Sequence, residues 1–185
     1  MKRLLTIAIF ATTMTLLSCN KTVKQPSENP LTAEWNTPYG IPPFDQIENE
    51  HYAPALKYAM SEHLAEIDSI VNNTDEPTFE NVIVALDNSG IKLAEINLIF
   101  GMLSSSDLDA EMQEVQNKII PRVEEHYNSI MLNEGLFNKV KAVYDNRKKM
   151  NLDELQMRLV DKTYNDFVRS GALLEGEAKE RLMKI

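Results

Sequence analysis

The stretch ALKYAMSEHLAEIDSIV, residues 55–71, decides the fold class. Its large apolar residues recur at intervals of three or four positions: Leu56, Met60, Leu64, Ile67 and Val71. This spacing places them on one face of an α-helix. The stretch therefore predicts an amphipathic helix that starts near residue 50, since Pro54 is tolerated only near an opening turn.

The segments after residue 77 carry further helical signals. TFENVIVALDNSG (78–90) begins with Thr78, which can cap a helix, and reaches Gly90, which can end or kink one. IKLAEINLIFGML (91–103) is apolar on several sides, which predicts a central, well-buried helix. Serines at 104–106 open the next helix, with Ser106 as its expected cap and a kink at Pro121.

The C-terminal third continues the helical pattern. NEG (133–135) separates a helix over about 136–145, and Asn151 is the expected cap of a helix over 152–169, with Glu154 in the capping-box position. The predicted apolar stripe of that helix is Leu152, Leu155, Leu159, Tyr164 and Phe167. Gly171 should end it, and a terminal helix begins near Glu175 without a stop signal before residue 185.

These signals predict an all-α fold of antiparallel helices joined by short loops, because no stretch carries a convincing strand pattern. The chain has 185 residues, of which 43% are hydrophobic and 25% charged, as in soluble globular proteins. Its net charge of −9 argues against a nucleic-acid partner.

The N-terminus has the features of an export signal. Basic residues at 2 and 3 precede an apolar run over 4–17, which is shorter than the ~20 residues needed to span a bilayer. LLSC (16–19) ends this run with the single cysteine and resembles a bacterial lipobox, in which cleavage falls between Ser18 and Cys19 and the Cys19 sulfur carries a diacylglycerol. The alternative is a plain signal peptide over 1–18 with an incidental cysteine.

Two segments are expected between this signal and the helices. Residues 19–30 contain the lipidated cysteine and a polar tether without hydrophobic periodicity. Residues 31–47 contain three prolines but also large apolar groups, so we expect an extended arm packed on the helical body, which covers residues 48–185. The apolar groups of the arm are Leu31, Trp35, Tyr39, Ile41 and Phe44.

A search of the sequence for catalytic or metal-binding residues assigns none. Glu48 and His51 form one half of a di-iron motif, but the second half is absent, and a histidine at a helix start explains them better. His126 lies on a predicted helix and is expected at its surface or boundary. The serines at 104–106 lack the neighbours of a nucleophile.

Four segments in this order carry a family resemblance: NPL (29–31), PPFDQIENEHYAPAL (42–56), PTFENVIVALDNSG (77–90) and YNDFVRSGALL (164–174). Together they resemble the start of the thimet-oligopeptidase-like metallopeptidases, closest to the bacterial peptidyl-dipeptidases, also called dipeptidyl carboxypeptidases, with oligopeptidase A nearby. The similarity runs from about residue 29 to residue 185.

The resemblance implies a helical enzyme of two lobes around a deep channel that admits short peptides. It also implies a zinc ion held by H-E-x-x-H and a further Glu, with the motif Glu as general base. This sequence has no such motif. The expectation is therefore a truncated N-terminal region, which forms one wall of the channel and is inactive alone. The intact enzyme is expected to be a monomer.

The expected whole enzyme is exported, anchored by lipid in the bacterial cell envelope (periplasmic or outer membrane), and releases C-terminal dipeptides. The alternative is a non-enzymatic helical lipoprotein that serves as a binding or assembly module.

Overall fold

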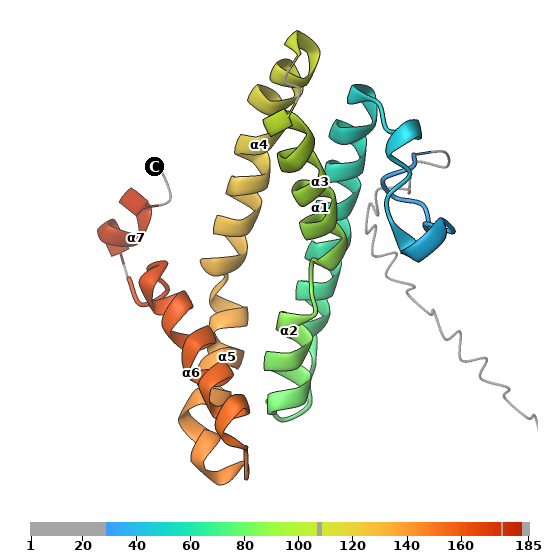
Figure 1. The fold of residues 1–185 in the computed structure, drawn as a ribbon. Coiled ribbons are helices and arrows are strands. Elements are labelled where there is room, and N and C mark those ends of the chain that lie inside the picture. Colours follow the sequence, from blue (N-terminus) through green and yellow to red (C-terminus); the bar gives the residue numbers. More distant parts are fainter. Residues whose placement is uncertain (1–28, 107–108, 175, 183–185) are drawn as a thin grey trace, which may run out of the picture.

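The computed structural model describes residues 29–106, 109–174 and 176–182, and these residues form helices and loops without a strand (Figure 1). The all-α prediction is confirmed. The α-helices are α1 (Asn49–Asn72), α2 (Ala85–Asp87), α3 (Ile91–Ser106), α4 (Ala110–Met131), α5 (Glu134–Asn146), α6 (Glu154–Arg169) and α7 (Gly176–Leu182). Short 3-10 turns are η1 (Pro38–Gly40), η2 (Phe44–Gln46) and η4 (Arg147–Lys149), and η3 (Phe79–Val84) is a π-helix.

Helices α1, α3 and α4 form the body of the molecule (Figure 1). Helix α1 packs on both α3 and α4, and its C-terminal part also meets α5. Helices α5 and α6 pack on each other at one end of α4, and η3 packs on both of them. No helix in the described part of the chain is long and apolar enough to cross a membrane.

The core is divided into two clusters that share no side chain. The first lies among Leu31, the N-terminal half of α1, α3 and the part of α4 up to Val123: Leu31, Tyr52, Ala55, Leu56, Ala59, Leu93, Ile96, Ile99, Phe100, Met112, Ile119 and Val123. The second lies among the C-terminal halves of α1 and α4, η3, α5 and α6: Ile67, Ile70, Phe79, Val82, Ile83, Ile130, Leu136, Phe137, Val140, Val143, Val160 and Phe167. Only α1 and α4 contribute buried residues to both clusters.

The buried face of α1 is rotated from the predicted stripe. Leu56 and Ile67 are buried as expected, but Leu64 is exposed, and the face is completed by small residues at Ala55 and Ala59. Small side chains at a contact allow neighbouring backbones to approach closely, which the search for large apolar residues overlooks.

Helix α3 departs from the prediction of a well-buried helix. Leu93, Ile96, Ile99 and Phe100 are buried, but Ile91, Leu98 and Met102 are 53%, 64% and 54% exposed. These three are seven and four residues apart, so they share one face of the helix. The helix is apolar on several sides as the sequence indicated, yet no described residue covers this face.

Two predicted helix caps are wrong, for the same reason. Ser106 is the last residue of α3, and its hydroxyl donates to the Met102 carbonyl at 3.0 Å, while Asp109 caps α4 by accepting from Met112 N–H at 2.7 Å. Asn151 has a left-handed backbone (φ 51°) and lies in a turn before α6. In both cases a capping residue two or three positions further along takes the role.

Asp153 is the cap of α6 and forms a reciprocal capping box with Gln156. Leu155 falls in the first turn and is 77% exposed, so the predicted stripe is wrong there, whereas Val160 and Phe167 are buried. Gly171 ends the helix as predicted, with φ 93° and a hydrogen bond from its N–H to the Val168 carbonyl.

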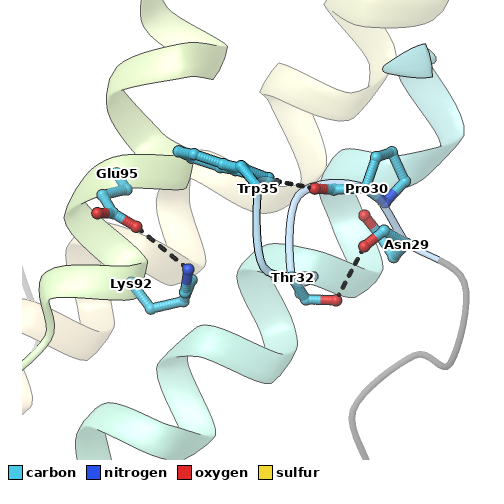
Figure 2. Close-up of polar contacts among 6 residues, drawn as sticks. All are labelled: Asn29, Pro30, Thr32, Trp35, Lys92 and Glu95. Atoms are coloured by element: carbon cyan, nitrogen blue, oxygen red, sulfur yellow. Dashed lines mark hydrogen bonds and ion pairs between the residues drawn. The ribbon is translucent and has the colours of Figure 1, made fainter. Parts of the chain in front are cut away.

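The described N-terminal segment begins at Asn29, inside the residues expected to form a polar tether. The Asn29 side chain is buried and donates to the His51 carbonyl at 2.7 Å, and Leu31 is fully buried. Trp35 donates from Nε1 to the Pro30 carbonyl at 2.8 Å, and its ring lies 5.3 Å from the Lys92 ammonium of α3 (Figure 2). The expected tether therefore does not extend to residue 30.

The rest of the arm follows a different course. Tyr39, Ile41 and Phe44 are exposed, and the 3-10 turns η1 and η2 interrupt the segment, so it is not extended throughout. Ile47 packs against the first cluster just before α1.

Candidate functional site

The residues singled out from the sequence do not form a reaction centre. Ser18 and Cys19 lie outside the described residues. His51 accepts the Glu48 N–H on its Nδ1 at 3.0 Å, which makes the pair a capping box of α1. Within residues 29–106, 109–174 and 176–182, no three His, Cys, Asp or Glu side chains lie together as metal ligands.

A polar cluster does exist in the interior, between α1 and α4. Nδ1 of His63 lies 3.0 Å from Nε2 of His126, and the two side chains are only 5% and 7% exposed. The prediction that His126 lies at the surface or boundary of its helix is therefore wrong. Its position, three residues after Val123 and four before Ile130, places it on the buried face of α4.

Ser89, in the turn between α2 and α3, extends this cluster. Its hydroxyl donates to the Leu86 carbonyl at 2.7 Å and lies 3.2 Å from Nε2 of His63. With its single proton directed at the Leu86 carbonyl, the Ser89 hydroxyl can only accept a hydrogen bond from His63, and this arrangement requires the tautomer of His63 that is protonated on Nε2. His63 Nδ1 is then an acceptor, and His126 Nε2–H donates to it. The hydrogen bonds run in one direction, from His126 through His63 and Ser89 to Leu86.

Gly90 lies against this cluster. Its N–H donates to the Glu66 carboxylate of α1 at 2.7 Å, and a Cβ at this position would lie 2.7 Å from two ring atoms of His63. Its φ of 70° is also a conformation that side chains disfavour. The predicted stop at Gly90 is confirmed, and the glycine also makes room for the imidazole.

Burial keeps both imidazoles neutral. Burial lowers the pKa of His63, and burial together with the neighbouring His63 lowers the pKa of His126 to about 4. The ring of Tyr127 flanks the pair, with its centre 6.0 Å from that of His63 and 5.7 Å from that of His126, and burial raises its pKa.

The order Ser89–His63–His126 resembles a nucleophile, a base and an orienting group, but the hydrogen bonds oppose that chemistry. His63 presents a proton to Ser89, so it cannot take one from the hydroxyl. The adjacent Gly90 N–H, which could otherwise stabilise an oxyanion, is already bound to Glu66. Ser89 and Glu66 also border a surface hollow of about 460 Å³. The cluster thus acts as a structural hydrogen-bonded network.

Comparison with known proteins shows the family to which this helical domain belongs. Residues 55–179 match the family model of the neurolysin/thimet oligopeptidase N-terminal domain. The chain belongs to this family. The family resemblance predicted from the sequence is confirmed.

Several peptidases are similar to this chain in sequence. The chain is 35% identical over 156 residues to the dipeptidyl carboxypeptidase of Salmonella typhimurium, covering 84% of this chain and 23% of the relative. It is 27% identical over 157 residues to oligopeptidase A of Escherichia coli, covering 85% and 22%. With organellar oligopeptidase A of Arabidopsis thaliana, the identity is 26% over 164 residues, covering 86% and 20%. The chain spans less than a quarter of the length of these relatives.

His63, Ser89 and His126 all lie inside the range matched to the family domain, whereas the arm and Glu48 lie before it. Sequence reasoning missed the histidine pair because neither histidine belongs to a known motif. One signal could have found it: His63 is four residues from both Ala59 and Ile67, so it continues the buried face of α1.

Proposed function

We propose that this chain is the N-terminal, non-catalytic region of a peptidase that hydrolyses short peptides and releases dipeptides from their C-termini. The observation that carries the proposal is the family match over residues 55–179, together with 35–36% identity to two dipeptidyl carboxypeptidases. The identity to oligopeptidase A is lower, at 27% or less, which favours the dipeptide-releasing activity.

The resemblance to metallopeptidases implies a zinc ion, but the residues of this chain do not fit a zinc centre. The sequence lacks H-E-x-x-H, and the described residues include no group of three potential ligands. In the proposed enzyme, the zinc ligands and the general base belong to residues beyond those of this sequence.

The contribution we assign to this region is one wall of the peptide channel. Support comes from the face of α3 formed by Ile91, Leu98 and Met102, which is apolar and exposed in the described structure. Clustered exposed apolar side chains typically mark a surface that binds another part of a protein or a ligand.

We also propose that the protein is exported and held at the bacterial cell envelope by lipid on Cys19. The support is the order of basic residues, apolar run and lone cysteine over residues 1–19. Multiple acyl chains on one residue would provide stable anchoring.

The experiment that tests this function starts from the gene. The reading frame is followed past codon 185, and its complete product is purified and incubated with an N-acetylated pentapeptide. We expect release of the C-terminal dipeptide, detected by mass spectrometry, and loss of this activity on treatment with a zinc chelator. The 185-residue chain alone is the matched control and should leave the peptide intact.

A frame that closes after codon 185, with a product that leaves the peptide intact, would contradict the proposal. That outcome would favour the helical lipoprotein that binds or assembles without catalysis. A frame that continues through H-E-x-x-H but releases single amino acids would retain the peptidase and exclude the dipeptide specificity.

A further inference from the structure

The histidine pair has no part in the proposed peptide hydrolysis, but it lies between the two hydrophobic clusters of the core. On α1, His63 lies between Ala59 of the first hydrophobic cluster and Ile67 of the second. On α4, His126 lies in the same way between Val123 and Ile130. The pair therefore joins α1 to α4 in the layer between the two hydrophobic clusters.

The hydrogen-bond pattern leaves His63 no capacity for a second proton. Its Nε2–H is directed at Ser89 Oγ and its Nδ1 accepts from His126. A proton on His63 Nδ1 would place two N–H groups opposite each other at 3.0 Å, which removes the bond between α1 and α4. A proton on His126 Nδ1 would keep that bond but put a charge in a buried site.

The charged and polar groups around the pair come from α1, from α4 and from the turn before α3. From α1, the Glu66 carboxylate is engaged with the Gly90 N–H, and Glu62 is engaged with the Tyr58 hydroxyl. From α4, Tyr127 flanks both rings, and Arg122, one turn before His126, is exposed and of the same sign as an imidazolium. From the turn before α3, the contacting group is the neutral Ser89 hydroxyl.

We propose that His63 and His126 form an acid-sensitive latch, which holds α1, α4 and the turn at Gly90 together while both rings are neutral and releases them when one ring takes up a proton. The latch is a property of this domain and does not depend on the proposed peptidase activity. In a protein at the cell envelope, it would link the packing of this domain to the pH of the surroundings.

The direction of the pH effect follows from the lowered pKa values. A histidine whose pKa is lower in the closed state stabilises that state fully above about pH 6.5 and loses this contribution as the pH falls toward about 4. With these limits for His126, the equilibrium constant for opening rises about tenfold by pH 5.5 and on the order of a hundredfold by pH 4.

Hydrogen–deuterium exchange with mass spectrometry tests the latch in the complete protein. Peptides covering residues 60–67, 86–91 and 119–130 are followed between pH 7.5 and 4.5 after correction for intrinsic exchange. We expect their protection to fall about tenfold by pH 5.5, and to stay level in the double variant His63→Gln, His126→Gln, which cannot titrate. His51→Asn is the matched control, because it removes a histidine outside the latch and keeps an acceptor near Nδ1.

Equal loss of protection in the wild type and the double variant would overturn the proposal, as would a wild type that stays level. If the double variant does not fold, ¹⁵N NMR of histidine-labelled wild type decides. We expect both rings neutral at pH 6, with His63 protonated on Nε2 alone. A His63 that titrates near its ordinary pKa, or that carries its proton on Nδ1, would equally refute the latch.

Discussion

The α-carbon of Gly90 lies so close to the ring of His63 that a methyl group on it would come within 2.7 Å of two ring atoms. The ring cannot easily move aside, since it is hydrogen-bonded to both Ser89 and His126. The positive φ of Gly90 adds a backbone cost for any other residue. We expect Gly90→Ala to lower the free energy of unfolding by about 2–4 kcal/mol, measured by urea denaturation.

Gly101 is the matched control for this substitution. It lies within α3, and a Cβ at that position would meet no atom within 4 Å. Gly101→Ala should therefore raise the stability by about 1 kcal/mol, because alanine favours helix. Equal losses of unfolding free energy in the two variants would show that the close approach to His63 does not destabilise Gly90→Ala.

Leu31 tests whether the N-terminal segment belongs to the folded body. Its side chain is fully buried against the first hydrophobic cluster. Leu31→Ala should cost about 2–4 kcal/mol of unfolding free energy, since it removes apolar contacts and leaves a cavity. Ile41→Ala, ten residues along in the exposed part of the segment, should change the stability by less than about 0.5 kcal/mol. Similar effects at both positions would mean that the segment is not packed as described.

The cap of α6 gives a third test. Asp153→Ala removes the acceptor for the Gln156 N–H and should cost about 1 kcal/mol in thermal or urea unfolding. Asn151→Gly should be neutral or slightly stabilising, because Asn151 has a left-handed backbone that glycine adopts more readily. A larger loss of stability in Asn151→Gly than in Asp153→Ala would indicate that Asn151 is the cap.

The lipid anchor is tested at Cys19. Cys19→Ala removes the thiol that a diacylglycerol would occupy, so we expect the product to move from the membrane fraction to the soluble fraction on cell fractionation. Ser18→Gly is the control, because it keeps a small residue at the proposed cut and should leave the protein in the membrane fraction. Membrane retention of Cys19→Ala would rule out anchoring through this residue.

The helical class, most loop positions and the family could be predicted because they depend on patterns along the chain. Thr78 and Gly90 carry local signals, and the structure has them where the sequence indicated. The caps at 106 and 151 were wrong because several capping residues stood close together, and the choice depends on the backbone at each one.

The histidine pair could not be predicted because its two members are 63 residues apart in the chain. Their meeting depends on how α1 packs on α4, and that packing is not encoded in the local pattern of either helix. Burial of a polar side chain is visible in a sequence only as a position on an apolar face, which many surface histidines also occupy. The exposed face of α3 could not be predicted for a related reason. When a helix is apolar on several sides, its sequence does not indicate which side remains uncovered in the fold.

The division of the core into two clusters has a consequence for how this domain can change through evolution or engineering. Since the clusters share no side chain, a substitution that alters volume in one imposes no direct steric demand on the other. The level of His63 and His126 is thus a natural crossover point for chimeras, in which one end of the bundle is exchanged for that of a relative while the other keeps its own sequence.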